Sequence, residues 1–232
     1  MSKPPGTVTD LPASDVRAQQ FRAGKAERAA PGIDAACTRI AIELQNLDRS
    51  SEEQGIRRCL EGFRDAASAD AAFIAFLDDG GQHLESVISA RGPFAQCHPE
   101  ALRGTQLASL PWVQSRLEHL RLSEFRDTAS PRKEQAEDAG ALAELAIGSA
   151  LLLAFRIKDQ AAGLLGLVYG LPRGGFDANL PVLMELLGSS LATGLERVRL
   201  SKALVRMEER NALAELAAND GLWDFDVDGN DV

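Results

Sequence analysis

The stretch IGSALLLAFRIKDQAAGLLGLVYGLPRGGFD, residues 147–177, decides the fold of this 232-residue chain. Ile147 to Ile157 and Ala162 to Tyr169 are apolar runs of strand length, and residues 158–161 between them suit a turn. The apolar density of both runs suits burial on both faces of a sheet. We therefore expect two adjacent antiparallel strands near the centre of a sheet, with a break at residues 172–177.

A second hairpin is predicted earlier in the chain. Residues 71–77 (AAFIAFL) form a short apolar run, Asp78 to Gly81 have the composition of a turn, and residues 83–90 (HLESVISA) alternate as a returning strand. The two hairpins together supply four antiparallel strands.

Three short elements are predicted between the hairpins. They are a helix over residues 109–120 with Pro111 in its first turn, a weak strand over 121–126 and a helix over 136–146. This segment is long enough to fold over one face of the sheet.

Apolar residues recur at helical spacing at both ends of the chain. A heptad pattern begins at Ile33, and Ser51 with Gln54 predicts a capping box at the start of a second amphipathic helix. A long helix is expected from about Ala178 to beyond Leu213. Such amphipathic helices need a partner surface for their apolar faces.

This order of elements indicates an α+β fold with a single antiparallel sheet of about five to six strands, flanked by N- and C-terminal helices that form a helical bundle. Over residues 33–205 the chain resembles a GAF domain, a small-ligand sensor module of signalling proteins. The resemblance rests on AAFIAFLDDGGQHLESVISARG (71–92), on LPWVQSRLEHLRLSEFRDTAS (110–130) and on the run quoted above, which a long helix follows.

The domain boundaries follow from this resemblance and, for the first 30 residues, from a composition poor in large apolar side chains. We expect a disordered tail over residues 1–30, a GAF-like sensor domain over 31–200 and a signalling-helix or coiled-coil linker over 201–219. The segment ERNALAELAANDGLWDFDVDGNDV at the end of the sequence resembles the opening of a PAS domain, so that 220–232 are the truncated start of one. The resemblance implies a multidomain bacterial signalling protein whose output domain is a cyclic-di-GMP synthase or phosphodiesterase, or a histidine kinase.

Composition excludes several classes of partner. The formal net charge of −9 argues against binding of double-stranded DNA, because affinity for phosphates comes from clustered Lys and Arg. Three cysteines without CxxC spacing fit a reducing cytoplasm better than a disulfide framework or a zinc site. The longest apolar run, residues 150–155, is too short to span a bilayer. A cytoplasmic protein with no nucleic-acid partner is expected.

Catalytic and cofactor motifs are not found in the sequence. GxSxG is missing, and the histidines His83 and His119 follow no metal-binding pattern, so we expect no catalysis, no metal and no cofactor. Phytochrome-type GAF domains attach a linear tetrapyrrole through a Cys-His pair close before the strand that corresponds to residues 147–157. Here Cys97 and His98 lie about 50 residues before it, so a loop cysteine and an exposed histidine are expected.

A ligand pocket is the expected site if the module is a sensor. In the GAF plan, the segment after the first hairpin folds over one sheet face and closes a pocket. The residues that we expect at its wall are three aromatic side chains and two polar neighbours: Trp112, Phe125, Arg126, Asp127 and Tyr169. The alternative is that the aromatic residues belong to an ordinary core and rim.

The sequence therefore predicts a regulatory module that binds a small ligand or relays a signal through its terminal helices to a downstream output domain. The alternative is a purely structural dimerisation domain with no ligand. In both, we expect a parallel homodimer in which Lys202 interrupts the seam and fixes its register. The expected interface consists of apolar residues of both terminal helices: Ile33, Cys37, Ile40, Leu44, Leu47, Leu191, Leu195, Val198 and Val205, continuing to Ala212 and Leu216.

Overall fold

The computed structural model describes residues 32–119, 122–158 and 160–220. All helices and strands described below belong to one compact unit that begins at Ile33. The predicted tail over residues 1–30 and the PAS-like residues after Asp220 lie outside the described residues.

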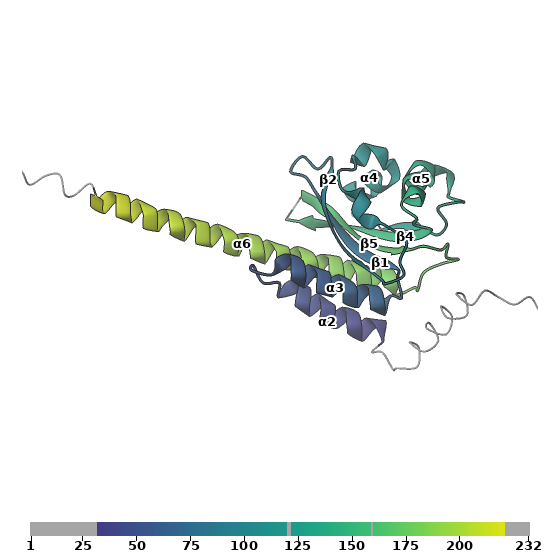
Figure 1. The fold of residues 1–232 in the computed structure, drawn as a ribbon, viewed down its shortest axis with the longest axis horizontal. Coiled ribbons are helices and arrows are strands. Elements are labelled where there is room, and N and C mark those ends of the chain that lie inside the picture. Colours follow the sequence, from purple (N-terminus) through teal and green to yellow (C-terminus); the bar gives the residue numbers. More distant parts are fainter. Residues whose placement is uncertain (1–31, 120–121, 159, 221–232) are drawn as a thin grey trace, which may run out of the picture. The chain divides into compact units, whose positions relative to one another are not determined.

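Five strands in the described part of the chain form one antiparallel sheet in the order β2-β1-β5-β4-β3 (Figure 1). The expected central pair is confirmed, because β4 and β5 pair antiparallel and neither lies at an edge. Their turn is tighter than predicted, since Ile157 already pairs with Gln160. The strands are β1 (Ala71–Leu77), β2 (Leu84–Arg91), β3 (Leu122–Phe125), β4 (Ser149–Ile157) and β5 (Gln160–Tyr169).

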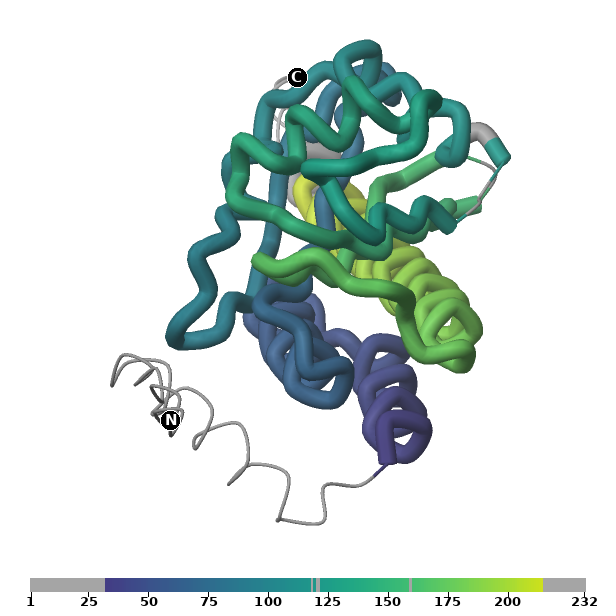
Figure 2. The backbone as a smooth tube through the Cα atoms, turned by 90° about the vertical axis from the view of Figure 1, so that its right-hand side faces the viewer, coloured from purple at the N-terminus to yellow at the C-terminus, as the bar shows by residue number. Residues whose placement is uncertain are grey.

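Helices cover both faces of the sheet (Figures 1 and 2). The three-helix layer on one face consists of α2 (Ile33–Gln45), α3 (Glu52–Ala66) and α6 (Leu180–Asp220). The α4–α5 layer on the other face consists of α4 (Pro111–Glu118), α5 (Ala136–Glu144) and three short 3-10 turns, η1 (Pro99–Leu102), η2 (Leu107–Ser109) and η3 (Lys133–Gln135). The structure thus has the predicted α+β architecture.

Helix ends differ from the sequence predictions in detail. The predicted capping box is wrong, because Ser51 precedes α3 without a side-chain hydrogen bond to the helix. Pro111 does lie at the start of α4, where its missing N–H leaves no helical bond unmade. None of the described helices is long and apolar enough to cross a membrane.

Strand alternation divides the core into two hydrophobic clusters, one on each face of the sheet. On β1, Ile74 packs with the three-helix layer, while its neighbour Phe73 packs with the α4–α5 layer. On β4, Leu153 and Leu152 divide in the same way. The apolar density that marked these strands in the sequence therefore reflects burial on both faces.

Helices α2 and α6 are in close contact at Gly194. A Cβ atom at this position would lie 1.9 Å from the carbonyl oxygen of Leu44. That contact is with backbone, which cannot rotate away as a side chain can. The crossing of the two helices therefore requires glycine at position 194.

We predict that Gly194→Ala lowers the free energy of unfolding by about 2 kcal/mol, because the new methyl group forces α2 away from α6. Gly140→Ala is the matched control, since Gly140 lies in a helix with open space around its Cα. The free energy of unfolding of this control is expected to rise by about 0.5–1 kcal/mol, because alanine has a higher helix propensity than glycine. Urea unfolding measures both values, and an equal gain in the two variants would contradict the close approach.

Candidate functional site

The structure does not bring the five predicted ligand-pocket residues together. Phe125 is 1% exposed in the cluster beneath the α4–α5 layer, and Trp112 packs against that cluster from outside. Tyr169 lies in the other cluster, beside the three-helix layer. The pairing explains this: Phe125 lies opposite Ala150, Ala150 lies opposite Val168, and the next residue, Tyr169, points to the other face.

The two polar residues of the predicted pocket have local partners. Arg126 is exposed and forms an ion pair with Glu124 at 2.6 Å. Asp127 accepts a hydrogen bond from the backbone N–H of Ala129 at 2.9 Å. Both side chains thus have partners close to them in the sequence, and the structure does not place all five predicted residues on one wall.

Side chains fill much of the region between the sheet and the α4–α5 layer. The ring of Phe73 packs directly on Gly166 of β5. A Cβ atom added at Gly166 would lie only 2.2 Å from this ring. Leu142, Ile147 and Phe125 are each 1% exposed in the same cluster. This packing matches the alternative in which the aromatic residues belong to an ordinary core.

A buried carboxylate joins α4 to α5. Asp138 of α5 is fully buried and accepts hydrogen bonds from the backbone N–H groups of Trp112, at 3.1 Å, and of Val113, at 2.8 Å. These are free donors of the first turn of α4, whose own N-cap residue, Leu110, has no side-chain acceptor. Burial raises the pKa of Asp138, while the two backbone donors act in the opposite direction.

Trp112 carries a buried hydrogen-bond donor without an acceptor. Among the described residues, its Nε1 is the one buried side-chain nitrogen or oxygen atom that has no partner. The guanidinium group of Arg116 stacks on the indole ring, 4.1 Å from its centroid. A buried donor left unpaired costs about 1–3 kcal/mol. A ligand that places an acceptor next to Nε1 would remove this cost and gain binding energy from it.

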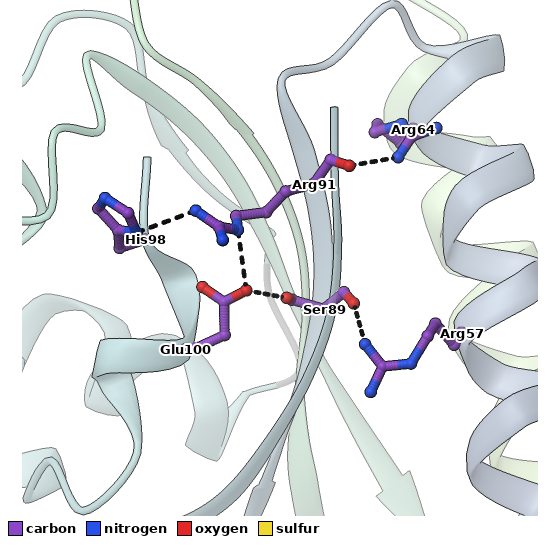
Figure 3. A network of polar contacts seen from close by, with 6 residues as sticks. All are labelled: Arg57, Arg64, Ser89, Arg91, His98 and Glu100. Atoms are coloured by element: carbon purple, nitrogen blue, oxygen red, sulfur yellow. Dashed lines mark hydrogen bonds and ion pairs between the residues drawn. The ribbon is translucent and has the colours of Figure 1, made fainter. Parts of the chain in front are cut away.

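Cys97 and His98 differ strongly in exposure. His98 is exposed, as expected, with its Nδ1 3.0 Å from a guanidinium nitrogen of Arg91 (Figure 3). Cys97 lies in a loop, as expected, and is fully buried in the cluster under the α4–α5 layer. Burial raises the pKa of its thiol to about 11, which leaves little thiolate at neutral pH.

A polar network covers the outer edge of β2 and joins it to the helical layers on both sides (Figure 3). Arg57 of α3 donates to the carbonyl oxygen of Ser89 at 2.9 Å, and Arg64 donates to that of Arg91 at 2.7 Å. On the other side, Glu100 of η1 accepts from the Ser89 hydroxyl at 2.5 Å and pairs with Arg91 at 3.2 Å. These contacts protect an edge strand against pairing with another sheet.

The two remaining histidines, His83 and His119, lie at a hairpin turn and just after a helix. His83 lies 3.2 Å from Asp78, whose pKa is lowered chiefly by hydrogen bonds from the backbone N–H groups of His83 and Gln82. These contacts hold the turn of the first hairpin. His119 is exposed after the end of α4. The described residues contain no group of three or more His, Cys, Asp or Glu that could hold a metal ion.

The helical residues predicted to face a second copy instead pack against one another within the chain. The reason is that α2 lies against both α3 and α6, so the two predicted stripes cover each other. Lys202, predicted to lie between two copies, pairs with Glu52 of its own chain at 2.5 Å. Ile33 and Val205 are half-buried, whereas the others lie in the core: Cys37, Ile40, Leu44, Leu47, Leu191, Leu195 and Val198.

α6 carries a different apolar surface that was not predicted from the sequence. Leu200, Leu204 and Met207 are 59%, 54% and 57% exposed. Leu200 also borders an open cleft of about 560 Å³ between the β4–β5 turn and α6, lined by Ile157, Lys158, Gln160, Glu196, Arg199, Leu200 and Ala203. The 4-3 spacing of the three exposed residues is a signal that could have identified this surface.

No family model and no curated protein matches the sequence. Solved structures do match it. The phycocyanobilin-bound GAF domain from a cyanobacterial phytochrome has a TM-score of 0.60 and 17% identity, over 75% of this chain and 98% of that one. The phycoerythrobilin-bound form gives 0.58 at 17% identity over the same shares. The PixJ GAF domain of Thermosynechococcus elongatus in its blue-light-absorbing form gives 0.51 at 16% identity, over 70% and 95%.

We predict that Asp138→Ala lowers the free energy of unfolding by about 1–3 kcal/mol, because two backbone donors of α4 lose their acceptor. In a Trp223→Phe background, Trp112 fluorescence should also shift to longer wavelength as α4 loosens. Glu137→Ala, an exposed neighbour, serves as control and should change stability by no more than about 0.5 kcal/mol. Wild-type stability and emission in Asp138→Ala would show that the carboxylate does not hold α4.

We predict that all three thiols react slowly with Ellman's reagent in the folded protein at pH 8 and rapidly after unfolding. Burial raises the pKa of Cys37 and Cys97 to about 11 and that of Cys59 to about 12, and only the thiolate is nucleophilic. A thiol that reacts in the folded protein as fast as free cysteine would show that one of these sites is open.

Proposed function

We propose that this chain, whose sheet and flanking helices have the GAF-domain fold, is a cytoplasmic regulatory module that relays changes in the domain through α6 to a downstream output domain. The observation that carries the proposal is the division of α6. This helix has 41 residues, and its buried residues lie between Leu180 and Val198. From Arg199 to Ala214 its side chains are exposed or half-buried. The proposed relay uses this part of α6, which the core does not bury.

Strand β4 provides the physical link between the two layers. Leu152 packs beneath the α4–α5 layer, and Leu153 packs with the three-helix layer. A Cβ atom at Gly188 of α6 would lie 3.1 Å from the Leu153 side chain, so helix and strand are in close contact. A shift of the α4–α5 layer that moves β4 would therefore press directly on α6.

A small ligand is proposed to act at the α4–α5 layer. The buried Nε1 of Trp112 is a donor that a ligand acceptor could satisfy, and the Arg116 guanidinium beside it favours a ligand with negative charge. The similar phytochrome domains are described as bound to phycocyanobilin and phycoerythrobilin, which are small organic ligands. Entry of a ligand here requires α4 to move outward, because side chains pack beneath it.

The alternative function is a purely structural dimerisation domain without a ligand. The packed cluster between the sheet and the α4–α5 layer favours it. In both proposals the module acts as a homodimer, and the PAS-like end of the sequence implies an output domain for cyclic-di-GMP turnover or a histidine kinase. The two proposals differ in whether any small molecule stabilises the protein.

We predict that at least one compound in a panel of linear tetrapyrroles, nucleotides and amino acids raises the melting temperature. A ligand at 100 times its dissociation constant adds about 2.7 kcal/mol of stability. Trp112→Phe, which keeps an aromatic ring but removes the donor, should weaken binding about 3- to 10-fold, as expected for one hydrogen bond. Trp223→Phe is the control and should bind normally. If no compound shifts the melting temperature, the structural alternative stands and the sensor role falls.

A further inference from the structure

We propose that α6 pairs with α6 of a second copy, parallel and in register, through a seam on the side of the helix opposite its buried residues Leu191 and Val198. The α6 seam consists of Leu200, Leu204, Met207, Asn211 and Ala214. This inference rests on the homodimer of the proposed function and assigns it an interface different from the one that the sequence predicted.

The α6 seam has the geometry of a coiled-coil stripe. Its residues follow a 4-3-4-3 spacing, and all five are exposed. At 100° per residue, Leu204 lies on the opposite side of the helix from Leu191 and Val198, which are buried against the domain. α6 therefore has two apolar sides, of which the domain covers one.

The seam begins where α2 ceases to cover the same side of α6. Arg197 lies one heptad before Leu204, and Ser190 lies one heptad before Arg197. Gln45, at the end of α2, donates to the Ser190 hydroxyl at 3.2 Å. Arg197 donates to the carbonyl oxygen of Leu47, just after α2, at 3.0 Å. Ser190 and Arg197 are thus polar and contact the end of α2 or the residues just after it, whereas the downstream positions are exposed and, apart from Asn211, apolar.

Asn211 favours the parallel arrangement. It lies one heptad after Leu204, at an a position if Leu204 is assigned to a. In a parallel, in-register pair, a-position residues face their own copies, so the two Asn211 amides can hydrogen-bond to each other. An antiparallel pair would place each amide against an apolar side chain, which leaves it without a partner.

Charges on the two flanks of the seam point to the same orientation. Arg210 lies on the g side of the stripe and Glu208 on the e side, and both are exposed. A parallel pair brings the g side of one helix to the e side of the other, so the basic flank of each copy meets the acidic flank of its partner. An antiparallel pair would bring like flanks together.

Disulfide trapping in the full chain tests the seam. Leu200→Cys, Leu204→Cys and Met207→Cys are made singly. The control is Arg206→Cys, on the side of the helix opposite Leu204. The three native cysteines are at most 3% exposed and leave little background. We expect every seam variant to form disulfide-linked dimers at least tenfold faster than the control. Trapping at one seam position alone, or equally at the control, would overturn the parallel, in-register pairing.

Sedimentation velocity separates this inference from the proposed function. Leu204→Glu changes an exposed residue, so its circular dichroism should match that of the wild type, while its dimer dissociation constant should rise at least tenfold. A dimer that survives Leu204→Glu and is not trapped at the seam overturns the seam but leaves the homodimer intact. A wild-type protein that is monomeric at every concentration and is not trapped overturns both.

Discussion

Burial of β4 on both faces is the constraint on which the rest of the structure depends. Of its nine residues, Arg156 alone is exposed. A strand so apolar must lie inside a sheet with a layer on each face, and here one layer comes from the terminal helices and the other from the segment between the two hairpins. The same burial makes β4 common to both hydrophobic clusters, with Leu152 in one and Leu153 in the other. The strand that stabilises the fold is therefore also the shortest physical connection between the α4–α5 layer and α6.

The second constraint is the length of α6 relative to the surface that can cover it. Within the domain, α2 and strand β4 of the sheet cover its apolar side as far as Val198. Beyond that point Lys202 still contacts Glu52 of α3, and the helix continues to Asp220. Exposed leucines on the outer side of a helix this long are costly in a monomer, because the hydrophobic effect favours their removal from water. A second copy that pairs with α6 would remove these leucines from water, and it would pair with the same part of the helix that is proposed to relay a signal.

Sequence patterns predicted the elements well because periodicity reflects burial directly. Both hairpins, the short helix at Pro111 and the three long helices follow from it. The site was less predictable, since the predicted pocket depended on which face each aromatic side chain occupies. Tyr169 and Phe125 lie on opposite faces because of a one-residue offset in pairing, and no single-chain pattern gives that register. The predicted dimer interface was wrong for a related reason. The heptad patterns that include Cys37 and Leu195 do mark buried helix faces, but a pattern cannot reveal whether the partner helix belongs to the same chain. The cap that Asp138 supplies to α4 joins residues 25 positions apart and carries no local signal.

The central claim is that the α4–α5 layer and α6 are coupled through β4, and amide hydrogen exchange tests it most directly. Exchange should be compared between the wild type and Asp138→Ala under conditions in which both are folded. The account predicts that protection falls in α4, in β4 and in the packed half of α6 around Leu187, and falls less in α3, which contacts β1 and β2 instead. A loss of protection confined to α4 and α5, or spread evenly over every helix, would contradict the coupling.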